Sequence, residues 1–218
     1  MNEGIQKPSW ARRVWRVARW PLGVLLVLYI GVVIYRVPAV IEKDKTAKAV
    51  AYINAQHITL ADVDGSHLPP APDQAQNDAT VAGIDANHNG IRDDVELAIF
   101  HLHPTSSKIR AAELQYALAL QLELTQVSNS ETWVAVVQKE SHGTSCIADT
   151  TPPLSSTTTP EFDKKVFALM DARNKEVEDL VLNTELRKEK IKSNGSYKTS
   201  YAAEGGNGCD INLGSLTD

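Results

Sequence analysis

An uninterrupted apolar run lies near the start of the chain. Residues 20–35, WPLGVLLVLYIGVVIY, contain no charged side chain, and a helix of this length spans roughly 24 Å at about 1.5 Å per residue. The hydrocarbon core of a bilayer is about 30 Å thick. The pattern therefore predicts a transmembrane helix over residues 20–41, in which the Arg36 side chain snorkels to the interface and residues 37–41 complete the span.

The flanking charges predict the orientation of this helix. Residues 1–19 carry a net charge of +4, whereas the whole chain carries −5, so the remainder carries −9. Three tryptophans lie among the N-terminal arginines, as at a membrane interface: Trp10, Trp15 and Trp20. By the positive-inside rule, residues 1–19 are a cytoplasmic tail and the later residues lie outside the cytoplasmic (inner) membrane. We expect an uncleaved signal anchor; the alternative is a signal peptide that is cleaved after Ala39.

The pattern after the membrane segment indicates helices. Residues 42–57 are expected to form a polar helix, and the LPPAP motif then ends regular structure, so residues 42–76 are predicted to be a stalk and a linker. Residues 77–218 are predicted to be the exported domain, an all-α fold of about four helices. These helices are expected at 93–103, at 105–127, from 130 to the Ser/Thr/Pro-rich loop at 149–160, and at 160–192.

The segment YALALQLEL, residues 116–124, alternates apolar and polar side chains in places, as a strand does. Its residues are nevertheless strong helix formers, and β-branched side chains are missing from it. Leucines lie on most sides of the predicted helix. The segment therefore predicts a central helix that is buried all round.

Composition and cysteine content exclude several classes of protein. A hydrophobic content of 43% supports a packed core, and the net charge of −5 argues against a nucleic-acid partner. Two cysteines are too few for a disulfide-dense scaffold or a four-cysteine zinc site. Both cysteines lie on the expected exported side, so we predict a Cys146–Cys209 disulfide. A loop of this length corresponds to about 4 kcal/mol in the chain-entropy account of disulfides.

One segment carries a chemical pattern. Residues 85–96 read DANHNGIRDDVE and match D-x-[DN]-x-[DN]-G-x5-E at every specified position. Ca²⁺ prefers six to eight oxygen ligands at about 2.3–2.6 Å, and side chains at alternate positions of a tight loop can supply them. Gly90 permits the sharp turn that a Cβ would strain. The sequence therefore predicts a calcium site; the alternative is an Asp/Asn/Gly-rich turn that caps a helix and binds no ion.

This loop resembles the calcium loops of the EF-hand superfamily and of its secreted dockerin-like and thrombospondin-type-3-like relatives. The resemblance covers little more than the 12 residues of the loop. It implies Ca²⁺ as the cofactor and the following ligands: Asp85, Asn87, Asn89, Ile91 through its carbonyl, Asp93 and Glu96. Arg92 departs from the family pattern, which usually has an aliphatic residue there. More broadly, the chain resembles single-pass bacterial envelope proteins that carry such a loop near the membrane, a resemblance that implies no activity.

These features predict a non-enzymatic binding or interaction module. We expect it to be anchored in the membrane by its N-terminal helix, to carry one structural Ca²⁺ and to bind a protein partner in the envelope, with no catalytic residues. The alternative depends on His101 and His103, which precede Pro104. Alternate histidines can share a metal ion, so a metal-assisted hydrolase would combine them with the acidic loop.

Overall fold

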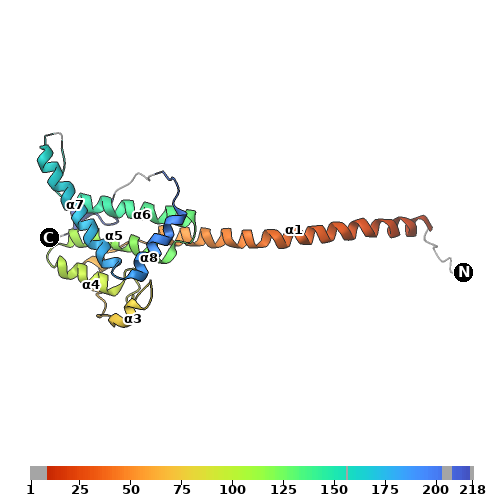
Figure 1. Ribbon diagram of the computed structural model, residues 1–218, viewed down its shortest axis with the longest axis horizontal. Coiled ribbons are helices and arrows are strands. Elements are labelled where there is room, and N and C mark those ends of the chain that lie inside the picture. Colours follow the sequence, from red (N-terminus) through yellow and green to blue (C-terminus); the bar gives the residue numbers. More distant parts are fainter. Residues whose placement is uncertain (1–8, 156, 203–207, 217–218) are drawn as a thin grey trace. The chain divides into compact units, whose positions relative to one another are not determined.

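The computed structural model describes residues 9–155, 157–202 and 208–216. The chain divides into two compact units, Met1–Ala47 and Lys48–Asp218. The regular structure of the described residues consists of helices without strands (Figure 1). The prediction of an all-α fold is therefore confirmed for this part of the chain.

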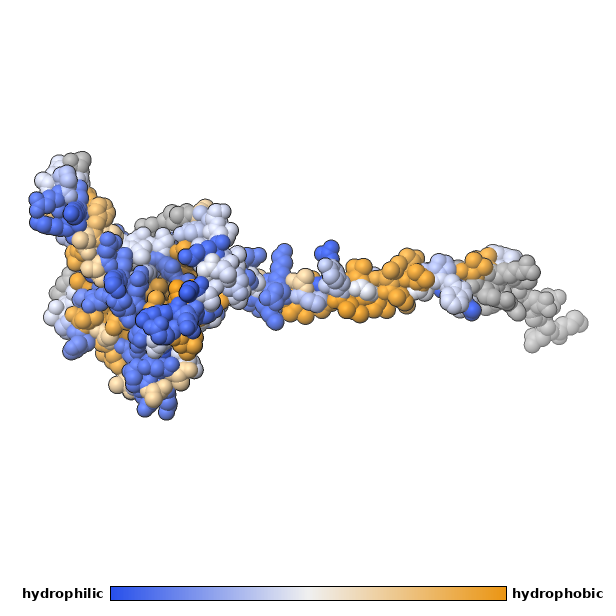
Figure 2. All heavy atoms as spheres, viewed as in Figure 1, coloured by the Kyte–Doolittle hydropathy of each residue, from blue (hydrophilic) through white to orange (hydrophobic). Residues whose placement is uncertain are grey.

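Helix α1, Ser9–Ala55, contains the predicted membrane segment. The stretch Arg19–Ala55 is long and apolar enough to cross a membrane, and none of its most apolar 18-residue window is buried. Apolar residues, coloured orange, follow this part of α1 in Figure 2, and large side chains such as Leu25, Val27 and Ile34 are exposed. Exposed apolar surface is unfavourable in water by about 25 cal/mol per Å², so α1 is a candidate membrane anchor.

Helix α1 does not end where the apolar run ends. It continues through the residues that were expected to form a stalk helix as far as Ala55, and Pro21 and Pro38 lie inside it. Prolines are tolerated in membrane helices, because local adjustments and neighbouring groups satisfy the backbone groups that they free. Residues 42–55 are therefore the C-terminal part of α1.

The second unit contains a core of long helices and several short ones. Side-chain caps mark many of the helix starts: Ser106, Asn129, Thr159 and Thr184 each accept a hydrogen bond from the backbone N–H three residues later. The helices after α1 are α2, Leu60–Val63; α3, Gln74–Asp78; α4, Asp93–Leu102; α5, Ser107–Gln126; α6, Ser130–Asp149; α7, Pro160–Val181; and α8, Glu185–Asn194, followed by 3₁₀ turns at Gly195–Tyr197 and Leu213–Ser215.

Helix α5 is the centre of this unit, and α4, α6, α7 and α8 all pack on it. Every residue from 110 to 124 is buried, including the strand-like segment. Several of its polar side chains form hydrogen bonds: the Gln115 amide donates to the Gly208 carbonyl and accepts from the Asp210 N–H, and the Gln121 amide donates to the Ala82 carbonyl. A polar group can be buried at low cost when it is hydrogen-bonded, and this explains how α5 is buried on all sides.

The helix expected over residues 160–192 is two helices. α7 ends at Val181, and α8 begins at Glu185 after its cap Thr184. The carbonyls of Leu180 and Val181 accept hydrogen bonds from the buried Arg92 guanidinium. Because these carbonyls are satisfied by a side chain from elsewhere in the chain, the last turn of α7 need not continue into a longer helix.

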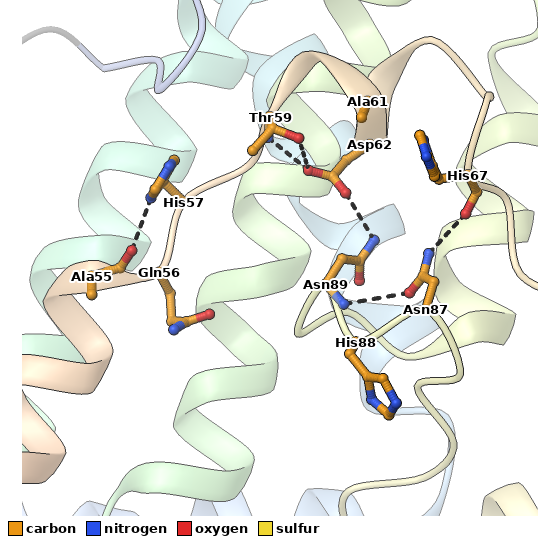
Figure 3. Close-up of a pocket in the computed structure, with 10 residues that line it drawn as sticks. All are labelled: Ala55, Gln56, His57, Thr59, Ala61, Asp62, His67, Asn87, His88 and Asn89. Atoms are coloured by element: carbon orange, nitrogen blue, oxygen red, sulfur yellow. Dashed lines mark hydrogen bonds between the residues drawn. The ribbon is translucent and has the colours of Figure 1, made fainter.

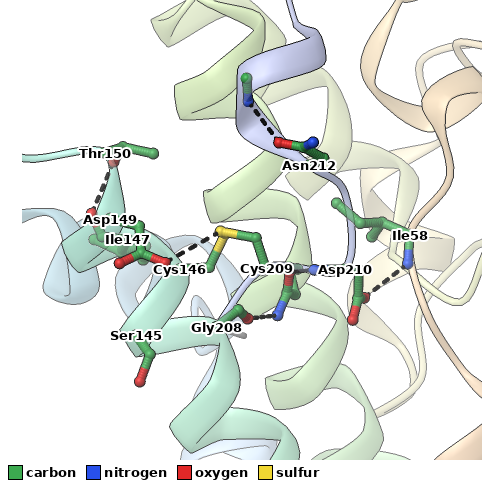
Figure 4. Close-up of a disulfide and its surroundings, with 12 residues drawn as sticks. Ile58, Ser145, Cys146, Ile147, Asp149, Thr150, Gly208, Cys209, Asp210 and Asn212 are labelled. Atoms are coloured by element: carbon green, nitrogen blue, oxygen red, sulfur yellow. Dashed lines mark hydrogen bonds between the residues drawn. A yellow bond between two sulfur atoms is a disulfide. The ribbon is translucent and has the colours of Figure 1, made fainter. Parts of the chain in front are cut away.

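The predicted disulfide joins the C-terminal segment to α6 (Figure 4). Cys146 and Cys209 are bonded with a Cα–Cα distance of 4.7 Å, which is usual for disulfides. Next to Cys209, the Asp210 carboxylate accepts a hydrogen bond from the Ile58 backbone N–H at 3.1 Å. The disulfide and the neighbouring hydrogen bonds therefore hold residues 208–210 against α6, α5 and the segment after α1.

Replacing both Cys146 and Cys209 by serine is expected to lower the free energy of unfolding by about 2–4 kcal/mol. The bond closes a sequence separation of 63 residues, and its loss gives the unfolded chain more conformational freedom. Urea unfolding of the full chain in detergent measures the change. A reducing agent should destabilise the wild type to the same extent and leave the double variant unchanged; equal stability of all four samples would contradict the prediction.

Candidate calcium-binding loop

The loop at residues 85–96 connects the segment after α3 to the start of α4. Its ends are held together by a hydrogen bond from the Asp93 N–H to the Ile84 carbonyl, 2.9 Å long. Two loop residues have positive φ: His88 at 59° and Gly90 at 86°. A side chain on Gly90 would also meet Leu118, so both its conformation and its packing favour glycine. These two left-handed residues turn the chain tightly around the loop interior.

Side chains at alternate positions face the backbone of the loop. The two Asp85 carboxylate oxygens accept the N–H groups of Asn89 and Gly90 at 3.2 and 3.0 Å. Asn89 Oδ1 accepts the Ile91 N–H at 2.9 Å, and Asn87 Oδ1 lies 3.4 Å from the Asn89 nitrogen. The structure therefore brings Asp85, Asn87 and Asn89 together within the loop.

Two acidic residues of α4 are buried at the loop. Asp93 is 0% exposed and Glu96 is 1% exposed. Asp93 Oδ1 accepts the Ala86 N–H at 2.9 Å, but Asp93 Oδ2 has no hydrogen-bond partner. Glu96 Oε2 accepts a hydrogen bond from the Asn87 amide at 3.0 Å. In the described part of the chain, neither carboxylate forms an ion pair with lysine or arginine.

Burial is the main influence on the acidity of both groups. Desolvation raises the pKa of Glu96 to about 7, although hydrogen bonds from Asn87 and Asn89 favour the ionised form. Desolvation also raises the pKa of Asp93, against the hydrogen bond from Ala86. A buried carboxylate without a positive partner is unfavourable. A bound cation would supply the missing positive charge.

Residues that precede the loop in sequence cover one side of it (Figure 3). Asp62 Oδ1 accepts a hydrogen bond from the Asn89 amide at 3.4 Å, and the His67 carbonyl accepts one from the Asn87 amide at 3.0 Å. A cavity of about 400 Å³ lies between this segment and the loop, lined by residues that include His57, Asp62, His67, Asn87 and His88. Sequence spacing did not reveal Asp62, because it approaches the loop only through tertiary packing.

Asp62 also has a local role. Its Oδ2 accepts hydrogen bonds from both the backbone N–H and the hydroxyl of Thr59, each 2.7 Å long, in a capping box at the start of α2. One carboxylate oxygen therefore stabilises α2 while the other faces the loop. This arrangement orients the Asp62 carboxylate toward Asn89.

Arg92 stands where the calcium loops that this segment resembles usually have an aliphatic residue, and its side chain is fully buried. Its guanidinium donates to the Val181 and Leu180 carbonyls at 3.0 and 2.8 Å, and its Nε donates to Asp94 at 2.5 Å. A Cβ added to Gly83 would collide with the Arg92 side chain, so the segment that enters the loop is fitted to this arginine. Arg92 therefore attaches the loop to the C-terminal end of α7.

The two histidines of the alternative hypothesis lie at the other end of α4. The helix has ten residues, so its ends are roughly 15 Å apart. His101 is exposed. His103 Nε2 lies 2.9 Å from the Glu113 carboxylate of α5. The structure therefore separates both histidines from the acidic loop, and the three features do not form one site.

No protein-family model, curated protein or solved structure matches this chain.

Proposed function

We propose that residues 85–96 bind one Ca²⁺ ion that stabilises a membrane-anchored interaction module. The observation that carries this proposal is the pair of buried carboxylates at the loop, one of which has an oxygen without a partner. The residues fit the ion: three carboxylates, two side-chain amides and one backbone carbonyl supply six oxygen ligands. Ca²⁺ would bind Asp85, Asn87, Asn89, Ile91, Asp93 and Glu96.

The expected affinity is that of a structural site. Two of the six ligands are neutral amides, and the loop has no second loop in the sequence to pair with. Extracellular calcium modules of low ligand charge have Kd values of about 10⁻⁴–10⁻³ M, and sensors reach 10⁻⁷–10⁻⁵ M. We therefore expect a Kd between about 10⁻⁵ and 10⁻³ M. Such a site is occupied permanently in a compartment with a high Ca²⁺ concentration, and its occupancy does not respond to small changes in that concentration.

The proposed location is outside the cytoplasmic membrane. The exposed apolar surface of α1 suits a lipid environment, and the basic N-terminal residues favour a cytoplasmic N-terminus. The Cys146–Cys209 disulfide supports an oxidising compartment for the second unit. These three observations agree with one topology: a single-pass anchor with the helical domain exported.

The proposed role of the exported domain is to bind a protein in the envelope. Its calcium loop, its disulfide and the buried Arg92 all strengthen contacts between segments that are distant in the sequence. Such cross-links keep a small domain rigid, and a rigid surface loses less conformational entropy when it binds a partner. We therefore propose recognition rather than catalysis as its activity.

Calcium titration of the full chain in detergent micelles tests the proposal. We expect saturable one-to-one binding by calorimetry and a rise in melting temperature with Ca²⁺; a concentration 100 times the Kd stabilises a protein by about 2.7 kcal/mol. Asp85→Ala should abolish both effects, because it removes the carboxylate that holds the Asn89 and Gly90 N–H groups.

The matched control is Asp64→Ala, which removes an exposed aspartate from the nearby turn after α2. This variant should bind Ca²⁺ like the wild type. If the wild type shows no binding up to about 10 mM Ca²⁺, beyond the weakest class of such sites, the loop is only a turn that caps α4 and the proposal is wrong.

A further inference from the structure

A second group of possible metal ligands lies at the opposite end of α4 from the calcium loop. It consists of His103 directly after α4, Glu113 on α5 and Glu176 on α7. These three helices pack against one another (Figure 1). One ligand atom from each residue lies within 4.8 Å of the other two. The fold therefore brings together an imidazole from the end of α4 and two carboxylates from α5 and α7.

Glu113 has a buried oxygen that the protein does not satisfy. The residue is 0% exposed. Its Oε1 accepts a hydrogen bond from Arg173 Nε at 2.9 Å, whereas its Oε2 has no hydrogen-bond partner. His103 Nε2 lies 2.9 Å from this Oε2, but it is also buried without a hydrogen bond. Two polar atoms thus face each other without the geometry of a hydrogen bond, an unfavourable arrangement in a buried position.

We propose that His103 Nε2, Glu113 Oε2 and the Glu176 carboxylate bind one Zn²⁺ ion. Imidazole nitrogen and carboxylate oxygen are ordinary zinc ligands, whereas Ca²⁺ and Mg²⁺ prefer oxygen alone. Three protein ligands leave a fourth position for water, as in open zinc sites. This site is independent of the calcium loop and adds a different metal to the proposed function.

The distances require only a small adjustment of the side chains. Zinc bonds of about 2.0–2.2 Å in tetrahedral geometry place neighbouring ligand atoms roughly 3.4 Å apart. The 2.9 Å distance between His103 Nε2 and Glu113 Oε2 must increase slightly. Ligand atoms of the group that lie as far as 4.8 Å apart must approach one another. His103 and Glu176 are both partly exposed, so these two side chains have room to move and the ion has access from solvent.

Arg173 acts as a positioning residue in this site. It occupies Glu113 Oε1 and also donates to the Thr150 hydroxyl at 2.5 Å, so its guanidinium fixes the direction of the remaining Glu113 oxygen. Carboxylates that bind metals are commonly held in this way by a second hydrogen bond. The ionised Glu113 and Glu176 carboxylates and the Arg173 guanidinium together carry a net charge of about −1, which favours binding of a divalent cation.

Zinc binding to the full chain in detergent tests the inference, with Zn²⁺ supplied in competition with a chromophoric chelator. We expect one Zn²⁺ per chain in the wild type. His103→Asn and Glu176→Gln should each weaken binding more than tenfold, because even the loss of a residue that only supports a ligand costs 10–100-fold. Both residues are partly exposed, so these variants should still fold, and thermal unfolding checks that they do.

The matched controls are His101→Asn and Glu189→Gln, which change an exposed histidine and an exposed glutamate outside the group. Both should bind Zn²⁺ like the wild type. Cobalt gives an independent readout, since Co²⁺ bound to nitrogen and oxygen ligands absorbs visible light; the band should appear in the wild type and vanish in His103→Asn.

Two results would overturn the zinc site. One is the absence of binding at micromolar free Zn²⁺, and the other is equal binding by the wild type and both ligand variants. The Asp85→Ala variant separates this site from the calcium loop: it should keep zinc binding whether or not the loop binds Ca²⁺.

Discussion

Replacing Arg92 by leucine is expected to lower the free energy of unfolding by about 3–5 kcal/mol, the usual cost of breaking a buried ion pair from one side. Leucine is the kind of aliphatic residue that EF-hand loops usually have at the corresponding position. In this protein, however, it would leave the Leu180 and Val181 carbonyls without the Arg92 donors and remove the cation that pairs with Asp94. Urea unfolding of the full chain in detergent measures the effect.

The matched control for Arg92 is Lys175→Leu, which removes an exposed cation from the Lys175–Asp179 pair on α7. Exposed pairs contribute little to stability, so this variant should unfold close to the wild type. We also expect Arg92→Leu to weaken Ca²⁺ binding, because the loop loses its attachment to α7. If the two variants were equally stable, Arg92 would not be the connection that we infer.

Calcium affinity is expected to fall about 100-fold between pH values well above 7 and pH 5. Burial raises the pKa of Glu96 to about 7, and only the ionised carboxylate can bind Ca²⁺. At pH 5, two units below that pKa, about one site in a hundred has Glu96 ionised, so protons compete strongly with the ion. Calorimetric titrations at a series of pH values give the affinity and the number of protons released.

Two variants identify the group that titrates. Glu96→Gln should bind Ca²⁺ weakly at every pH and lose most of the pH dependence. His88→Asn should keep the wild-type dependence of Ca²⁺ affinity on pH. Asparagine tolerates the positive φ of this position. If the dependence of Ca²⁺ affinity on pH instead disappeared in His88→Asn, the histidine and not Glu96 would control binding.

The same pKa predicts that stability depends on pH differently with and without calcium. In the calcium-free protein the folded-state pKa of Glu96 lies above its unfolded value of 4.5. The contribution of protonation to stability is complete below pH 4.5 and is lost as the pH rises through about 7. Saturating Ca²⁺ keeps Glu96 ionised in the folded protein, and the unfolded chain is also ionised above pH 4.5, so the calcium-bound protein should lose little stability over that pH range.

Local patterns in the sequence were sufficient for several features. The apolar run of residues 20–35 predicted the candidate membrane helix, and the positions of Asp93, Ser130 and Pro160 predicted the starts of α4, α6 and α7. The positions of the two cysteines in the chain predicted their disulfide. The turn from Asp85 to Gly90 is also local, because the hydrogen bonds that close it join residues at most five positions apart.

Other features depend on contacts between residues that are distant in the sequence. At the break between α7 and α8, the Val181 carbonyl accepts a hydrogen bond from Arg92, which lies 89 positions earlier in the sequence. The alternative hypothesis combined His103 with His101 and the loop, yet His103 lies near Glu113 and Glu176. Asp62 reaches the loop from 27 positions before Asn89.

The physical reason is the range of the interactions. Helix propensity, capping and turn formation act over a few residues, so the sequence by itself determined the starts of α4, α6 and α7, the tight turn at residues 85–90 and the apolar stretch of α1. Burial of a charged side chain is decided by what packs over it. Only the tertiary structure could therefore decide that Arg92 closes the end of α7, that Glu96 is held in a buried, weakly acidic state, and that Glu113 directs a free oxygen toward His103.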